Sequence, residues 1–163
     1  MESCYCGSGK TFEKCCMKYL LKEDIVNTPS ELIQSRYSGF CEKNLDYILF
    51  TNSDNVRREL NQKTIESWIE AVHFNKLEIV SVENDEFDSS HALVEFKVHF
   101  QVGYAEHIHY EIAHIIRHKG RWTYDGMISM KKRAEMGFKI SLDDLCLCGS
   151  GKLFRECCAK SCK

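Results

Sequence analysis

The sequence predicts an α+β fold, in which helices pack on one face of a curved antiparallel sheet and a small metal-binding module stands at each end. Three observations lead to this prediction. Apolar residues recur at helical spacing in the first half of the chain. In the second half they alternate with polar residues, as in strands. Eight of the ten cysteines fall in two copies of one short pattern, one near each terminus.

The composition is that of an ordinary globular protein of 163 residues, 44% hydrophobic and 28% charged, which suits one domain with small additions. No apolar run approaches the roughly 18 residues that span a bilayer, and the start lacks a signal-peptide pattern. We therefore expect a cytoplasmic protein without membrane insertion, whose thiols stay reduced. The net charge of −2 argues against a dedicated nucleic-acid binder. In this setting, ten cysteines indicate metal or redox chemistry rather than disulfides.

The cysteine pattern is C-x-C-G-S-G-K-x-F-x-x-C-C, and it occurs in an N-terminal module (residues 1–18) and a C-terminal module (residues 146–163). The eight candidate metal ligands are Cys4, Cys6, Cys15, Cys16, Cys146, Cys148, Cys157 and Cys158. Because every cysteine of one copy has a counterpart in the other, we expect both modules to hold the same kind of metal.

Zinc fits this spacing best, as Zn²⁺ in proteins prefers four ligands at tetrahedral corners. The C-x-C pair supplies two thiolates, and Gly7 and Gly9 allow the chain to reverse so that the C-C pair closes the site. A disulfide between adjacent cysteines is strained, and iron is the main chemical rival. Four protein ligands leave no open position, so we expect two structural zinc ions per chain that supply folding energy to modules too short for a core.

Two cysteines stand outside the repeat. We expect Cys41 to be a small, partly buried hydrophobic residue and Cys162 to be a spare thiol in the terminal tail.

The central domain, residues 19–130, begins with helical patterns, after a short helix expected within residues 17–27. Thr28, Pro29 and Glu31 predict a helix start with a capping box, and apolar residues then recur as far as Phe40. Asn44 predicts the cap of a second, short helix. Apolar positions of a third helix are Ile65, Trp68, Ile69 and Val72, with Thr64 as its predicted cap.

The pattern then changes to strands. We predict one near residues 76–83 and another, with strict alternation, over 92–102. A third run places apolar residues on one face and polar residues on the other. The apolar set is Ile108, Tyr110, Ile112, His114 and Ile116, and the polar set is His107, His109, Glu111 and Arg117. Lys119 and Gly120 predict a tight turn into a fourth strand, and residues 131–145 are predicted to be a linker.

Several of these segments resemble a known family. The terminal copies resemble the SEC-C motif, the zinc-binding segment of the preprotein translocase motor SecA, although the fourth ligand there is often His. The whole chain resembles the YchJ-like family. In the middle, Ser35-Arg36-Tyr37-Ser38-Gly39-Phe40 is similar to the family's S-R-Y-x-A-F, and Gly120-x-Trp122-x-Tyr124-Asp125-Gly126 is close to its G-x-W-x-Y-x-D-G. The resemblance implies a cone-shaped domain similar to nuclear transport factor 2, and it implies no activity.

The first functional hypothesis is a non-catalytic adaptor. The resemblance to SEC-C segments implies contacts with partner proteins and, by extension, with the ribosome or its RNA. Basic residues that could meet an acidic surface are Lys10, Lys14, Lys18, Lys152, Arg155 and Lys160. The competing interpretation is that these side chains only solvate and neutralise the metal site. Exposed sheet in this fold class commonly pairs, so a homodimer is a further expectation.

The second hypothesis, from a different class, is a small-molecule site or enzyme in a pocket between helices and sheet, which the fold alone does not decide. Candidate lining residues are Tyr37, Trp68, Tyr110, His114, Trp122 and Tyr124. For His114 a hydrogen-bonded core position is favoured over a catalytic base, because no carboxylate partner is evident on its face. We expect Asp125 and Arg36 to be structural, as a pair joining the first helix to the last strand.

A third hypothesis places a metal site on the outer face of the sheet. It would use His91, His99, His107 and His109, which the strand pattern assigns to matching faces of neighbouring strands. Solvent-facing histidines are the favoured interpretation.

Overall fold

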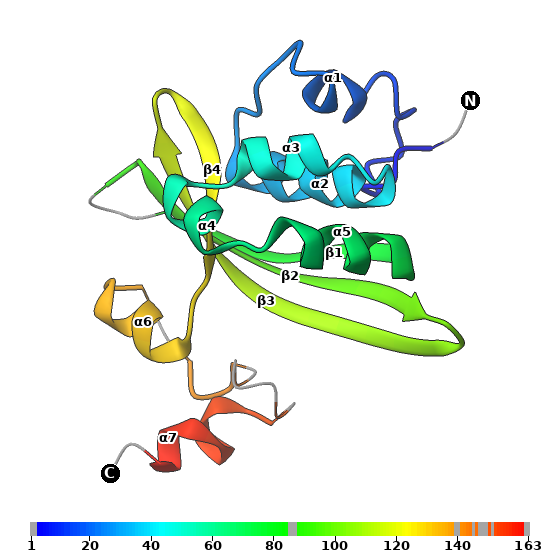
Figure 1. Cartoon of the computed structure of the whole chain (residues 1–163). Coiled ribbons are helices and arrows are strands. Elements are labelled where there is room, and N and C mark those ends of the chain that lie inside the picture. The colour runs from blue at the N-terminus through cyan, green and yellow to red at the C-terminus, as the bar shows by residue number, and fades with distance from the viewer. Residues whose placement is uncertain are drawn as a thin grey trace.

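A computed structural model describes residues 3–84, 88–138, 141–144, 146, 150 and 152–161. A layer of helices covers one face of a four-stranded sheet, which confirms the predicted α+β class (Figure 1). The N-terminal module lies beyond the helices, and the C-terminal module lies beyond the opposite face of the sheet (Figure 1). The two cysteine modules are therefore on opposite sides of the central domain.

The sheet is an antiparallel meander in the order β1-β2-β3-β4, so each strand pairs with the next one in sequence. The strands are β1 (Val72–Asn84), β2 (His91–Val102), β3 (Ala105–His118) and β4 (Arg121–Met127). Lys119 and Gly120 form the predicted tight turn, with φ values of 49° and 79°. Two successive positive φ angles match the right-handed twist of the flanking strands, which brings β4 back beside β3.

The helical layer consists of α2 (Pro29–Cys41), α3 (Leu45–Thr51), α4 (Asp54–Glu59) and α5 (Gln62–Ala71), preceded by the short α1 (Met17–Leu20). The predicted capping box is confirmed: the Thr28 hydroxyl accepts from the N–H of Glu31 at 3.2 Å, and the Glu31 carboxylate accepts from the N–H of Thr28 at 3.1 Å. Asn44 caps α3 as predicted, accepting from the N–H of Tyr47.

The structure corrects the third predicted helix at both ends. Asn61, not Thr64, caps α5, because its side chain accepts from the N–H of Thr64 at 3.2 Å. Val72 is the first residue of β1 rather than the last apolar position of the helix. Helix α4 was not predicted, since it buries none of its residues and so shows no apolar period.

Gly39 allows α2 and α3 to pack closely. A Cβ at this position would lie 3.1 Å from Cδ1 of Tyr47 and 3.2 Å from Cδ1 of Ile48. Both of these side chains are almost fully buried. Gly39 thus lies within the last turn of α2, which ends at Cys41, and it allows the contact between the two helices.

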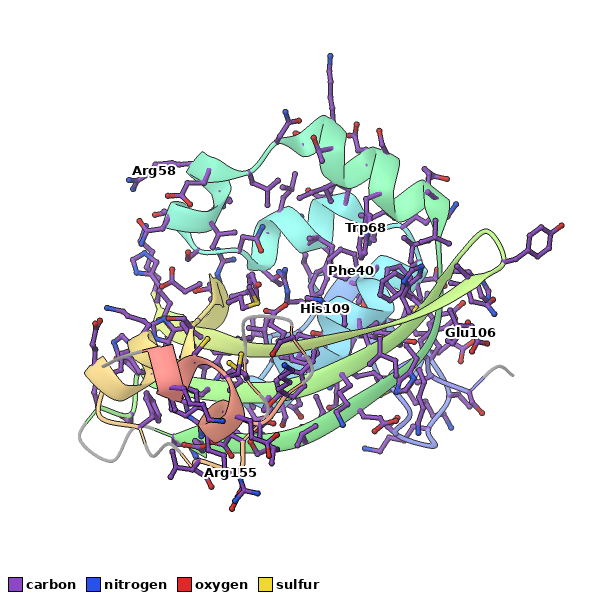
Figure 2. The ribbon with its side chains drawn as sticks, turned by 90° about the horizontal axis from the view of Figure 1, so that it is seen from below. Phe40, Arg58, Trp68, Glu106, His109 and Arg155 are labelled. Carbon is purple, nitrogen blue, oxygen red and sulfur yellow. The ribbon has the colours of Figure 1, made fainter. Side chains whose placement is uncertain are left out.

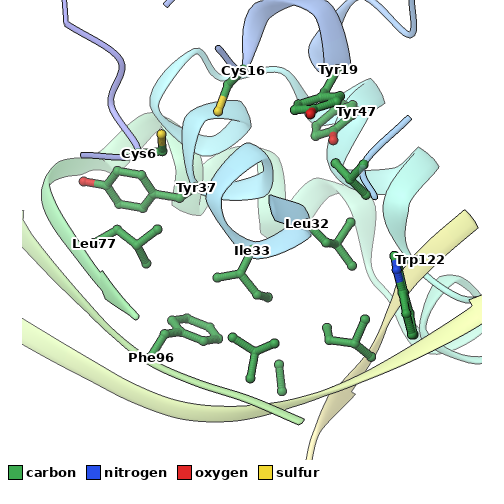
Figure 3. Packing of buried hydrophobic residues seen from close by; sticks show 14 of the residues in the cluster. Cys6, Cys16, Tyr19, Leu32, Ile33, Tyr37, Tyr47, Leu77, Phe96 and Trp122 are labelled. Atoms are coloured by element: carbon green, nitrogen blue, oxygen red, sulfur yellow. The ribbon is translucent and has the colours of Figure 1, made fainter. Parts of the chain in front are cut away.

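Both faces of the sheet carry buried side chains. Leu32, Ile33 and Tyr37 of α2 pack on Val94 and Phe96 of the sheet (Figure 3). On the opposite face, a second cluster combines Leu93, Ile112 and Ile128 with three partly buried residues, Met136, Phe138 and Phe154. The main core thus lies between helices and sheet, and the second one lies under the C-terminal part of the chain.

This double coverage corrects the predicted faces of β3. The odd positions Ala113 and Ile115 belong to the core under the helices, whereas Ile112 belongs to the second cluster. The polar set of the alternation, which includes His109 and Glu111, therefore faces the helices, and the apolar set faces away from them. The prediction was wrong because alternation shows that a strand has two faces without showing which one is more deeply covered.

The segment predicted to be a linker, residues 131–145, contains most of helix α6 (Met130–Glu135). Arg133 on this helix is buried; it pairs with Glu83 of β1, and with Asp144 at 3.5 Å. These two pairs fasten α6 to the sheet and to the chain that leads into the C-terminal module. Among the described residues, no helix is long and apolar enough to cross a membrane.

Candidate metal centres and a central cavity

The cysteines of the N-terminal module form one cluster. The Sγ atoms of Cys4, Cys6, Cys15 and Cys16 all lie within 4.8 Å of one another. The Sγ atom of Cys15 is 3.6 Å from that of Cys6 and 3.9 Å from that of Cys16. Four thiolates bound to one metal ion at about 2.3 Å, in a tetrahedron, would be about 3.8 Å apart. The side chains therefore fit a metal ion with four sulfur ligands.

The backbone of the loop holds this arrangement. The N–H of Cys4 donates to the carbonyl of Lys10 at 2.8 Å, which closes the loop between the two cysteine pairs. Gly7 and Gly9 have φ values of 78° and 74°, a region that L-residues with a side chain rarely adopt. The predicted reversal of the chain thus takes place at these glycines, and it returns the C-C pair to the C-x-C pair.

The loop also favours a thiolate. A hydrogen bond with Cys16 lowers the pKa of the Cys6 thiol to about 4, and the same contact raises the pKa of Cys16. The hydroxyl of Ser8 lies 3.2 Å from Sγ of Cys15. Burial raises the pKa of Cys15, so without an ion the cluster favours one thiolate, at Cys6, and the thiolate is the form that binds metals.

The N-terminal cluster is part of the main core of the domain. Cys4, Cys6 and Cys16 are buried in the same cluster as α2, on the side of this helix away from the sheet (Figure 3). Sγ of Cys4 lies 3.8 Å from the hydroxyl of Ser38 on α2. A metal ion held here would therefore stabilise the contact between the module and the central domain as well as the loop itself.

The C-terminal module repeats this geometry. The Sγ atoms of Cys146, Cys157 and Cys158 lie within 4.8 Å of one another. The N–H of Cys146 donates to the carbonyl of Lys152 at 2.7 Å, and the hydroxyl of Ser150 lies 3.2 Å from Sγ of Cys157. Both contacts have counterparts in the first module. Cys148, the predicted fourth ligand, lies outside the described residues, as does Cys162.

Among its described residues, the C-terminal module contributes one side chain, Phe154, to a core cluster of the domain. Phe154, in the 3₁₀ turn η1 (Phe154–Glu156), packs against the second core cluster, and its N–H donates to the carbonyl of Asp144. The last helix, α7 (Cys158–Ser161), follows directly. The two modules therefore share a local geometry and differ in how they are attached.

A cavity of about 240 Å³ lies between the helices and the sheet. Its lining includes aromatic side chains, namely Tyr37, Phe40, Trp68, Phe74, Phe96, Phe100 and Tyr124. Figure 2 shows Phe40 and Trp68, from α2 and α5, together with His109 of β3 between the helical layer and the sheet. Trp68 keeps 42% of its surface exposed, so it marks the entrance.

Polar side chains also line the cavity. The carboxylate of Glu111 lies 2.7 Å from Nε2 of His109 and accepts the hydroxyl of Tyr124, also at 2.7 Å. The hydrogen bond between Glu111 and His109 raises the pKa of His109, because the carboxylate stabilises the charged imidazole. The guanidinium of Arg36 is buried, lies 4.5 Å from the ring centre of Tyr124, and donates to Thr51 at 2.6 Å.

Of the predicted pocket residues, Tyr37, Trp68 and Tyr124 line this cavity. Tyr110, His114 and Trp122 are not among its lining residues. Tyr110 donates to Glu95, and Trp122 donates to the carbonyl of Asn27 at 3.0 Å. Tyr110 and His114 were assigned to the wrong face of β3. The sequence analysis missed His109 and Glu111 as cavity residues, although their two-residue spacing on one strand face was a usable signal.

His114 does have a carboxylate partner, contrary to the expectation. Its Nδ1 lies 3.2 Å from Asp125, and its Nε2 lies 3.0 Å from His91. Burial lowers the pKa of His114, so the neutral form is favoured. Asp125 therefore pairs with His114 rather than with Arg36, whose contacts are the carbonyl of Ile48 and the side chains of α2, α3 and β4.

The hypothesis of a four-histidine metal site is wrong. His99 pairs with Ile108, and His107 pairs with Phe100, so His99 and His107 point to opposite faces of the sheet. His91 shares the face of His99, and His109 shares that of His107. Among the described residues, the groups that could hold a metal are the two cysteine clusters. Cys41 is half-buried against the main core, as expected, and burial raises its pKa to about 12.

Comparison with protein families agrees with this geometry. A family model described as "YchJ, middle NTF2-like domain" matches residues 28–126, more than half of the chain. The chain belongs to the YchJ family. The SEC-C motif matches twice, at residues 2–18 and 144–160, which are the two cysteine modules. The YchJ domain thus accounts for the helices, the sheet and the cavity between them, and the SEC-C motifs account for the metal centres.

Curated YchJ-family relatives match along nearly their whole length. A UPF0225 protein of Haemophilus influenzae strain PittEE is 30% identical, with 96% of this chain and 92% of the relative covered. A UPF0225 protein of Geobacter sulfurreducens is 28% identical, with 95% and 96% covered. The similarity to these relatives therefore extends over the central domain and both terminal motifs of this chain.

Two solved structures have the same fold. The solution structure of a SEC-C motif containing protein from Rhodopseudomonas palustris has a TM-score of 0.69 and 30% identity, covering 76% of this chain and 94% of that one. The crystal structure of a SEC-C motif containing protein from Psychrobacter arcticus has a TM-score of 0.67 and 24% identity, covering 98% and 97%. Because its sequence identity is only 24%, the Psychrobacter arcticus structure supports the fold and nothing further.

Proposed function

We propose that this chain is a zinc-binding protein with one structural zinc ion in each cysteine module, and that it acts as a non-catalytic adaptor in the cytoplasm, contacting protein partners or the ribosome. The observation that carries the zinc proposal is the cluster of four Sγ atoms within 4.8 Å in the N-terminal module. Closed sites of four thiolates favour zinc, and they leave no position for a substrate.

The second zinc ion rests on the repeat. The three described Sγ atoms of the C-terminal module share the spacing of the first cluster, and Cys148 occupies the equivalent sequence position of the fourth ligand. Ser8 and Ser150 make matching contacts with the third cysteine of their copies. These contacts support the same kind of metal binding in both modules.

The zinc proposal is tested by native mass spectrometry and elemental analysis of untagged protein purified without chelator. We expect two zinc ions per chain. Cys148→Ser should leave one, whereas Cys41→Ser, which changes a cysteine outside both clusters, should leave two. Bound iron, absence of metal, or a mass that lacks thiol protons would refute the proposal.

The adaptor role is supported by the surfaces of the modules. Lys10 and Lys14 of the first module, and Lys152 and Lys160 of the second, are exposed, and no ion pair engages them among the described residues. Four thiolates and one Zn²⁺ leave each site negative, so part of this charge neutralises the site. The remaining exposed lysines can meet an acidic surface.

The adaptor role is tested by co-sedimentation of the protein with purified ribosomes and by affinity capture of its protein partners. The triple change Lys10→Glu, Lys14→Glu and Lys152→Glu should abolish binding. A matched control is Arg58→Glu, Lys63→Glu and Lys119→Glu, which alters the charge equally on exposed residues outside the modules. Equal binding by both variants would show that the modules are not the contact surfaces.

A further inference from the structure

Asn52 is the most unusual polar residue of the cavity. It follows the last residue of α3, is 1% exposed, and lines the cavity. Neither its Oδ1 nor its Nδ2 has a hydrogen-bond partner among the described residues. A buried polar group without a partner loses its hydrogen bonds to water and gains none in return, so most such groups in folded proteins are satisfied. Asn52 thus presents one unsatisfied donor and one unsatisfied acceptor.

The other polar groups around the cavity already have partners. Glu111 is bound by His109 and Tyr124, and Arg36 donates to two oxygens of α3. None of their side-chain atoms is unsatisfied and buried. Among the described residues that line this cavity, Asn52 is therefore the one whose fully buried side-chain atoms have no hydrogen-bond partner.

Charges of both signs lie at this end of the cavity, since His109 as well as Arg36 lies near Glu111. Arg36 and Glu111 are both buried and carry opposite charges. Glu111 pairs with His109 and not with Arg36. A carboxylate on a ligand would meet the like charge of Glu111, and an ammonium group would meet that of Arg36. The site therefore favours a neutral polar group.

The remainder of the wall suits a ring. Trp68 contacts Phe40 edge-on, with ring centres 5.9 Å apart, and also lies 6.1 Å from Phe100. Aromatic rings favour such edge-to-face neighbours, and a ligand ring packed against these side chains from the cavity gains contacts of the same kind. A volume of about 240 Å³ is below the range of about 300–1,000 Å³ typical of drug-sized ligands. The occupant must be compact.

We propose that this cavity binds a compact ring compound with a neutral group that both donates and accepts a hydrogen bond, a carboxamide or a hydroxyl, paired with Asn52. The aromatic side chains hold the ring, and Trp68 covers the entrance. This binding site is independent of the metal centres, since none of the metal-ligand cysteines lines it.

Asn52 also borders a second hollow of about 220 Å³, next to α4. That hollow is lined by exposed charged side chains such as Arg58 and His118, and Arg57 there pairs with Asp54. Water reaches such groups, so they offer little burial for a ligand. Asn55 lines this hollow but not the aromatic cavity, which makes it a matched control for Asn52.

The proposal is tested by titrating the metal-loaded full-length protein with benzamide, and separately with phenol, in two-dimensional NMR. The indole N–H signal of Trp68 should shift with saturation at millimolar probe. The indole N–H of Trp122 donates to Asn27 outside the cavity and should not shift. No shift of the Trp68 signal with either probe would overturn the proposal.

Variants separate a ligand-binding role of Asn52 from a structural one. Asn52→Leu should weaken benzamide binding at least about tenfold, a loss of one good hydrogen bond, and should leave the melting temperature equal or higher because an unsatisfied polar group is removed. Asn55→Leu should bind like the wild type. A lower melting temperature with unchanged binding in Asn52→Leu would sink the idea, as would loss of binding in Asn55→Leu alone. If Asn52→Leu fails to fold, Trp68→Leu at the exposed entrance decides the question: unchanged affinity in that variant overturns the site.

Discussion

The Sγ atom of Cys4 lies 3.8 Å from the Oγ atom of Ser38, so a candidate metal ligand of the N-terminal module contacts the last turn of helix α2. When Cys4 is a thiolate, the hydroxyl is the donor in this contact. Ser38 also reaches the carbonyl of Gln34 at 3.2 Å, so the sulfur and this carbonyl compete for one proton. The contact joins metal binding to the fold of the domain.

The first prediction concerns this hydroxyl. Ser38→Ala should lower the zinc affinity of the N-terminal site about tenfold, because hydrogen bonds to a ligand atom tune metal binding. The fold should remain. Competition with a chromophoric chelator measures the affinity, and Ser30→Ala, at the start of the same helix, is the control. Equal affinities would show that the contact is incidental.

The second prediction compares equivalent cysteines of the two modules. Cys4→Ser should destabilise the central domain by about 3 kcal/mol or more, since loss of a structural metal is among the most damaging changes. Cys146→Ser should cost the domain less than about 1 kcal/mol, because Cys146 lies outside the main core cluster. Both cysteines are 4% exposed, so burial alone does not distinguish them. Urea unfolding followed by the fluorescence of buried Trp122 measures both, and equal losses would contradict the asymmetric attachment.

The third prediction concerns the attachment of the C-terminal module. Arg133→Met removes the buried charge that pairs with Glu83 and Asp144. We expect hydrogen exchange to accelerate in residues 141–161 while the sheet keeps its protection, because this arginine fastens α6 to the chain that enters the module. Lys132→Met changes an exposed neighbour on the same helix and should have no effect. Unchanged exchange in Arg133→Met would show that the pairs made by Arg133 do not hold the module.

The fourth prediction concerns pH. The hydrogen bond with Glu111 raises the pKa of His109 above its unfolded value of about 6.5. The resulting stability is fully present below pH 6.5 and is lost as pH rises through the folded-state pKa. Glu111→Gln should return the His109 pKa towards 6.5, so wild type and variant should differ more in stability at pH 6 than at pH 9. NMR titration of His109 and urea unfolding at both pH values test this; a difference that grows with pH would contradict it.

The sequence by itself determined the cysteine modules, the class of fold and several helix ends. Each cysteine cluster is made within about fourteen residues, so the repeat and the two glycines specify it locally. The caps at Thr28 and Asn44 are local as well, because a side chain satisfies an N–H three residues away.

Only the tertiary structure decided which face of β3 meets the helices and which module joins the main core. Both sides of the sheet are covered. Alternation therefore could not show whether His109 and Glu111, or Tyr110 and His114, face the helices. The same holds for α4, which has no buried face to produce a pattern. Burial of a strand face depends on elements distant in sequence, namely the helical layer on one side and the chain around α6 and Phe154 on the other. Ligand spacing within a short loop depends on backbone conformation and hydrogen bonds between residues close in sequence, and for this reason it was readable from the sequence.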